Sequence, residues 1–364
     1  MMKLNPKIIK IKAKILTSIH IDNNEILDRM DYFTFDWWNE IQILDRKWLN
    51  FCAEKDRELF DNIIKNIELG NFLKVEDYKY DFYTKYSEDF FEKYILEDEL
   101  KIWEKAKESI LQAKEYENQR NQNWNQWEIK RFSRFGINKD LFIPWSTLKG
   151  IFRTIFLNDE ISKISWNYKN QERELKKIDN LDNFKKDLFA FLQFEDIKID
   201  DDFLEIHQIN SENKPKKEWD TSKKWPPQVV EMINKWEFEI IINDNKWQIN
   251  INKLEEMIKK YSTNIIAREE KILDNIENNW DLLGILDKNY NNSIYPIKIW
   301  MFKKSLSYKL FWEEMIDDLN KNFSWEEWLK ESRKKWIWDK MIYLDENKNP
   351  IWWIWLSDIQ ILEN

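Results

Sequence analysis

A chain of 364 residues corresponds to about two domains of ordinary size. Hydrophobic residues make up 43 % of it and charged residues 34 %, so it can bury a core, and global disorder is excluded. The single cysteine, Cys52, excludes a disulfide framework, and the two histidines, His20 and His207, disfavour a zinc site. No apolar run approaches about 18 residues, so we expect no membrane span and a cytoplasmic protein.

Glycine and tryptophan occur in unusual numbers, with 4 Gly and 22 Trp. Average usage of Gly would give about 25 in a chain of this length, and Gly is needed wherever φ is positive or backbones approach closely. We therefore hypothesise that many Trp letters stand for Gly, as happens when UGA codons that the host reads as Gly are translated as Trp. The alternative is a genuinely Trp-rich protein. The hypothesis fails if Trp145, Trp236, Trp300 and Trp352 are all encoded by UGG.

The first predicted element is a strand over residues 7–21, because apolar and basic residues alternate there with a period of two. The alternating residues are Ile9, Ile11, Ala13 and Ile15 on one face and Lys10, Lys12 and Lys14 on the other. The basic face suits either contact with a phosphate backbone or a solvated, edge-protected strand. We favour the second interpretation.

Helical patterns over 54–70 and 85–120 follow, and in the second the residues Leu100, Trp103, Ile110 and Leu111 form an apolar stripe. They indicate a helical insertion after the first strand. The later part of the chain mixes strands with helices, which predicts an α+β protein. Its predicted elements are helices over 146–157, 172–192, 253–279 and 304–331, a linker or long loop over 211–228, a hairpin over 236–251, and strands over 294–300 and 351–362.

The most informative stretch runs from Phe142 to Thr154. Ser146 or Thr147 is expected to cap a helix whose Lys149 and Arg153 share one face at a spacing of four. A helix N-terminus with free N–H groups, hydroxyls and two cations suits a phosphate. From the spacing alone, an ordinary surface helix with two solvated cations is the simpler interpretation. The residues expected to pack inward are Leu148, Phe152, Ile155 and Phe156.

With Gly at position 145, residues 143–153 would read Ile-Pro-Gly-Ser-Thr-Leu-Lys-Gly-Ile-Phe-Arg. This resembles the motif of the RAMP superfamily of type III CRISPR–Cas complexes, hydrophobic-Pro-Gly-Ser-(Ser/Thr)-hydrophobic-Lys-Gly-x-hydrophobic-Arg. Softer matches resemble the fifth-subunit family of the type III-A (Csm) complex, although a sister subunit of a type III-B complex stays open. They lie at residues 16–21, 231–238, 297–305 and 349–354, and in the last three a Trp (236, 300 or 352) stands where that family has Gly.

The resemblance implies ferredoxin-like (RRM-type) RAMP domains with antiparallel sheets and helical insertions. We expect an N-terminal RAMP domain over 1–225, with its insertion over about 37–130, and a C-terminal RAMP-like domain over 226–364. The implied function is that of a non-catalytic RNA-binding subunit near the 3′ end of the guide RNA, which supports guide maturation in antiviral defence. The implied partners are the guide RNA (crRNA), the other subunits of the type III-A effector complex and recruited host nucleases.

The resemblance also selects the residues expected to bind RNA. They are Trp145 (as Gly), Ser146, Thr147, Lys149, Gly150 and Arg153, with Lys303 and Lys304 as a second contact and Arg131 and Arg134 as weaker candidates. The net charge of −9 argues against binding by the whole surface, so we expect a local basic groove.

Two alternatives remain at this stage. One is a metal-independent RAMP endoribonuclease with His20 as general base, although packing roles are the more common for both His20 and His207. The other is a protein-only scaffold. We assign no cofactor and no metal, because the carboxylate pairs Asp201/Asp202 and Asp317/Asp318 are read as solvated charges.

Overall fold

A computed structural model describes residues 7–34, 40–69, 71–101, 106, 128–135, 140–161, 188–213, 228–234, 236–245, 249–273, 295–299, 341–345 and 351–362. These residues form helices and largely antiparallel sheets, so the predicted α+β class is confirmed. The predictions for Trp103, Ile110, Leu111, residues 172–187 and residues 304–331 lie outside the described residues. No helix of the described part is both long and apolar enough to cross a membrane.

The first five-stranded sheet is antiparallel throughout and has the first strand of the chain in its middle. Its order is β14 (Tyr295–Lys298), β16 (Trp353–Leu362), β1 (Lys7–Ile15), β13 (Glu237–Asp244) and β9 (Leu192–Phe194). The strand predicted over 7–21 is confirmed for Lys7–Ile15, where the alternating apolar residues are buried, but residues 16–21 do not continue it.

The three lysines of β1 lie on the other face of this sheet, and each is paired with a carboxylate of a neighbouring strand. Nζ–O distances of 2.5 to 2.9 Å join Lys10 to Glu239, Lys12 to Asp358 and Lys14 to Glu237. Because β1 is an inner strand, edge protection was the wrong reason for these lysines. Their role is to balance the acidic residues on the solvated face.

The second five-stranded sheet contains one parallel pair, β12 with β6, among antiparallel ones. Its order is β15 (Met341–Leu344), β11 (Leu204–Asn213), β12 (Gln228–Ile233), β6 (Ile129–Phe132) and β2 (Asp22–Leu27). The expected domain boundary at 225/226 falls between β11 and β12, which pair with each other. Both sheets therefore take strands from either side of that boundary.

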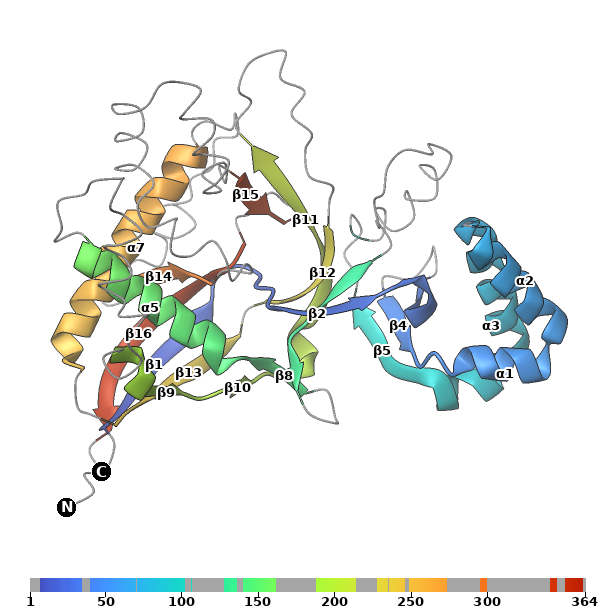
Figure 1. The fold of residues 1–364 in the computed structure, drawn as a ribbon, viewed down its shortest axis with the longest axis horizontal. Coiled ribbons are helices and arrows are strands. Elements are labelled where there is room, and N and C mark those ends of the chain that lie inside the picture. The colour runs from blue at the N-terminus through green and yellow to red at the C-terminus, as the bar shows by residue number, and fades with distance from the viewer. Residues whose placement is uncertain are drawn as a thin grey trace, which may run out of the picture.

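Two long helices cover one face of the first sheet (Figure 1). They are α5 (Trp145–Ile161) and α7 (Ile251–Leu273), which correspond to the predicted helices over 146–157 and 253–279. A three-stranded sheet leads into α5; its order is β10 (Ile197–Lys198), β8 (Asp140–Ile143) and β7 (Arg134–Phe135). Short 3₁₀ helices lie at η1 (Arg29–Asp31), η3 (Leu188–Phe191) and η4 (Asp201–Phe203).

The predicted insertion forms a helical lobe beside the two large sheets (Figure 1). It consists of α1 (Trp48–Lys55), α2 (Arg57–Glu68), α3 (Phe72–Tyr94) and the sheet β3 (Tyr32–Thr34), β4 (Glu40–Leu44) and β5 (Ile95–Lys101). The lobe has its own core of Phe33, Leu44, Trp48, Phe51, Cys52, Ile63, Val75 and Phe82. Residues 95–101, which were expected to be helical, form a strand because they pair with β4.

The predicted hairpin over 236–251 is wrong in its second half. Its first strand is β13, but Ile251 begins α7. The carbonyl of Asn250 accepts from Leu254 and its side chain accepts from Lys253, so Asn250 caps the helix. Ile249 and Ile251 are spaced by two as in a strand, but they flank the residue that caps α7.

Candidate nucleic-acid interface

The N-terminus of α5 follows directly from strand β8. Leu141 and Ile143 of β8 point into the core, Pro144 interrupts the ladder, and the helix begins at Trp145. The amide of Trp145 donates to the Asp196 carboxylate at 2.7 Å. Those of Thr147 and Leu148 donate to the Pro144 carbonyl.

The first turn of α5 is therefore not a set of bare amides, and this part of the expected phosphate site is wrong. Neither Ser146 nor Thr147 caps the helix, because Asp196, the residue just before β10, takes that place, and β10 pairs with β8. A cap supplied from 51 residues away leaves no trace in the local sequence. Asp196 is thus a residue of the site that sequence reasoning missed.

One face of α5 carries the two expected cations, although the Nη2 atom of Arg153 is buried. Ser146, Lys149, Gly150 and Arg153 recur at spacings of three and four and so form one row, called here the α5 stripe. Ser146 is exposed, and the other three are partly exposed. Thr147 lies beside the row. A Cβ placed on Gly150 would meet no atom within 4 Å, so the stripe is open at that point.

The ammonium group of Lys149 is held close to the protein. It donates to the Leu192 carbonyl at 3.3 Å and lies 5.7 Å from the centroid of the Trp145 ring. If position 145 is glycine, the contact with the Trp145 ring does not exist, and the carbonyl of Leu192 still holds the ammonium group.

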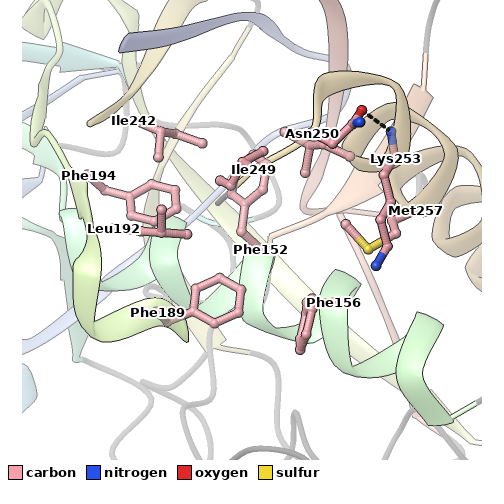
Figure 2. Close-up of a pocket in the computed structure, with 11 residues that line it drawn as sticks. Phe152, Phe156, Phe189, Leu192, Phe194, Ile242, Ile249, Asn250, Lys253 and Met257 are labelled. Atoms are coloured by element: carbon pink, nitrogen blue, oxygen red, sulfur yellow. Dashed lines mark hydrogen bonds between the residues drawn. The ribbon is translucent and has the colours of Figure 1, made fainter. Parts of the chain in front are cut away.

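The side of α5 next to the stripe packs on aromatic residues around an apolar cavity of about 90 Å³ (Figure 2). Phe152 and Phe156 project from α5, with ring centroids 5.4 Å from Phe194 and 5.7 Å from Phe189 respectively. The cavity also reaches Met257 of α7. Since its lining is mainly hydrocarbon, it suits anchoring of the helix rather than phosphate binding.

The weaker candidates Arg131 and Arg134 are not available to RNA. Their side chains are 3 % and 4 % exposed, and both bind the fully buried carboxylate of Glu231. That carboxylate also accepts the amide of Phe132 at 2.7 Å. Two guanidinium groups and one carboxylate enclosed in this way are structural, because the charges stabilise one another away from water.

His20 is fully buried and cannot reach a substrate in this structure. Its Nδ1 lies 2.7 Å from the Glu231 carbonyl, and its ring meets Phe132 edge-on at 6.2 Å. Burial lowers the pKa of His20, so the ring is neutral. His207 is also buried, with Nε2 3.3 Å from Glu205 and 3.2 Å from Asn234.

The remaining candidates Lys303 and Lys304 lie outside the described residues, as does Trp300. Of the other three positions at which Gly was expected, Trp352 has the positive φ of 72° that favours glycine. Trp145 and Trp236 do not have a positive φ. Trp236 is partly buried and stacks on Phe238 at 5.1 Å.

Comparisons with known proteins agree with this geometry at the level of the fold. No protein-family model matches the chain, and no curated protein matches it. The crystal structure of T. onnurineus Csm5 matches with a TM-score of 0.56 and 14 % identity, over 94 % of this chain and 99 % of that chain. A chain of a cryo-EM structure of a Csm–crRNA–target RNA ternary complex, from a type III-A CRISPR–Cas system, matches with a TM-score of 0.58 and 14 % identity, over 97 % of this chain and 100 % of that chain.

The likeness covers both five-stranded sheets and the helical lobe, because almost all of each chain is aligned. It confirms, for the fold, the resemblance carried by residues 16–354. This protein shares its fold with Csm5 over nearly its whole length.

Proposed function

We propose that this protein is a non-catalytic RNA-binding subunit of a type III-A CRISPR effector complex. The observation that carries the proposal is the likeness to Csm5 and to a chain of a Csm–crRNA–target RNA complex over almost the full length. In this role the protein sits near the 3′ end of the guide RNA and supports its maturation in antiviral defence. Its partners are then the guide RNA, the other type III-A subunits and the host nucleases that trim the guide.

The α5 stripe supplies the contact with the guide. Lys149 and Arg153 neutralise backbone phosphates, the Ser146 hydroxyl donates a hydrogen bond, and the missing side chain at Gly150 lets a sugar–phosphate backbone approach the helix. Such contacts fix the path of a strand without reading its sequence. A protein of net charge −9 needs this local site, because its overall field repels RNA.

The endoribonuclease alternative loses its best base in the structure. A general base must come within hydrogen-bond reach of the proton that it removes, and His20 is enclosed by Glu231 and Phe132. This supports a subunit that holds the guide while recruited nucleases trim it.

One observation favours the scaffold alternative. Two donors near the start of α5 already have protein partners, since the Trp145 amide donates to Asp196 and the Lys149 ammonium group donates to the Leu192 carbonyl. Assembly of the complex with and without this protein distinguishes an RNA-binding subunit from a protein-only scaffold. We expect the protein to copurify with the other type III-A subunits and guide RNA, and complexes that lack it to carry guides with untrimmed 3′ ends.

A Lys149→Gln, Arg153→Gln protein should still join the complex but leave the same untrimmed ends. A Lys253→Gln protein, changed at an exposed lysine of α7, serves as control and should behave as the wild type. Normal guide ends with the stripe variant would favour the scaffold. Failure of the wild-type protein to copurify with these subunits would refute the proposed function.

A further inference from the structure

The outward face of the sheet β10–β8–β7 carries two phenylalanine rings that stand apart from the core. Phe135 is 71 % exposed, and its ring contacts that of Phe142, at 5.7 Å between centroids and an interplanar angle of 63°. Leu141 and Ile143 point to the other side and are buried, so the alternation of β8 turns Phe142 outward. We call Phe135 and Phe142 the aromatic shelf.

The shelf lies close to the α5 stripe along the chain. Strand β8 runs straight into α5, as Figure 1 shows, and only Ile143 and Pro144 separate Phe142 from the first helical residue. Lys198 is the ladder partner of Phe142 on β10, and its side chain is 73 % exposed beside Asp140 at 3.1 Å. The shelf therefore has an exposed cation as its ladder neighbour on β10.

The size of the shelf indicates whether a protein surface or a nucleobase covers it. A stable protein partner needs about 800 Å² on each side, whereas a phenylalanine side chain offers at most about 150–250 Å². Two rings match one or two nucleobases. Every base has a π-face, so rings beside cations bind single strands with little sequence preference, while a duplex keeps its bases stacked internally.

We propose that the aromatic shelf stacks unpaired bases of the RNA strand whose phosphates lie along the α5 stripe. This inference rests on the proposed function and adds a second kind of contact to it. The stripe contributes a salt-dependent part of the affinity, and the shelf contributes a part that salt does not screen. Neither ring depends on which Trp letters stand for Gly.

The test uses the full-length protein in the assembled complex, with guide RNA that carries a fluorescent adenine analogue whose emission is quenched by stacking. The analogue is placed in turn at each position near the 3′ end. We expect quenching at one or two adjacent positions. Phe135→Leu should abolish that quenching and weaken guide binding about 5- to 100-fold, with an unchanged dependence on salt.

Two further variants complete the design. Phe135→Tyr keeps an aromatic ring and should retain both quenching and affinity. Leu69→Ala removes a side chain that is equally exposed, at 69 %, on the helical lobe, and it should have no effect on either. Because Phe135 is so exposed, its variants should melt at the wild-type temperature.

The outcomes separate the shelf from the function on which it rests. If the complex with the wild-type protein retains no guide RNA, the proposed function and the shelf both fail. If guide RNA is retained and Phe135→Leu changes neither quenching nor affinity, the shelf is refuted and the proposed function stands. If Phe135→Leu releases a protein subunit while RNA binding is unchanged, the rings are a protein contact and the shelf is likewise refuted.

Discussion

Trp352 is the residue whose geometry conflicts most directly with its side chain. It is fully buried at φ 72°, a conformation that costs a non-glycine residue about 1–2 kcal/mol. Its amide donates to the Ser18 carbonyl, and its carbonyl accepts from Ile299, so the backbone is fixed from both sides. The chain cannot relieve this conformation by rotating the peptide. The geometry supports glycine at this position, as the composition predicted.

We therefore expect Trp352→Gly to stabilise the protein. Removal of the left-handed strain should raise the free energy of unfolding by about 1–3 kcal/mol, measured by chemical denaturation. A buried tryptophan that evolved in place would instead cost about 3–5 kcal/mol when removed. The two explanations thus predict opposite signs.

The neighbouring Trp353 provides the matched control, since it is equally buried and its φ is not positive. Trp353→Gly should be strongly destabilising. If Trp352→Gly is destabilising to a similar extent, position 352 is a true tryptophan. Peptide masses of the protein from its native host would identify the residue directly.

His20 makes stability depend on pH. Burial holds its pKa below the unfolded value of 6.5, although Asp22 and Glu231 raise it and Lys130 lowers it. As the pH falls below 6.5, the unfolded chain binds a proton that the folded ring does not, so the folded state loses stability. One such group contributes at most about 1.4 kcal/mol per pH unit.

The measurement compares the wild type with His20→Asn, whose amide can still donate to the Glu231 carbonyl. The difference in unfolding free energy between the two proteins should change between pH 7 and pH 5, with the wild type losing more. A constant difference would mean that His20 has the same pKa in the folded and unfolded states. His20→Ala should be less stable than His20→Asn at both values because it leaves the carbonyl without its donor.

At the scale of elements, local periodicity predicted β1 and α5, because one face of each is buried. The same reasoning failed where contacts distant in the chain decide the outcome. Residues 95–101 have a helical composition but pair with β4, and Asp196 caps a helix that begins 51 residues earlier. For the candidate site, the cations of the α5 stripe could be predicted from spacing and resemblance. The hydrogen bond that occupies the Trp145 amide could not, because its acceptor Asp196 is distant in the chain.

A substitution at Gly150 tests whether this glycine serves the stability of α5 or its contact with RNA. Glycine inside a helix costs about 0.5–1 kcal/mol relative to alanine, and a Cβ at this position meets nothing. Gly150→Ala should therefore raise the free energy of unfolding by that amount, yet weaken guide RNA binding by the complex, because the methyl group occupies the approach to the helix.

Thr263→Ala is the control for this experiment. Thr263 is exposed on α7 and its hydroxyl bonds back to the Lys259 carbonyl, so alanine improves helix propensity away from the α5 stripe. It should stabilise the protein and leave guide binding unchanged. Equal RNA affinity of Gly150→Ala and the wild type would show that nothing approaches the helix there.

For the whole molecule, the net charge of −9 restricts where RNA can bind. The basic face of β1 is balanced by Glu239, Asp358 and Glu237. Arg131 of β6 and Arg134 of β7 are enclosed around Glu231. The α5 stripe combines two partly exposed cations with open space at Gly150. Under the proposed function, this acidic protein contacts RNA only locally.

The most direct measurement of that claim is the salt dependence of guide RNA binding by the assembled complex. Each phosphate contact with a single strand contributes about 0.7 to the slope of log affinity against log salt. Lys149→Gln with Arg153→Gln should reduce the slope by about 1.4, whereas Lys12→Gln with Lys14→Gln on the paired face of β1 should leave it unchanged. An unchanged slope for the Lys149, Arg153 variant would contradict phosphate binding by α5.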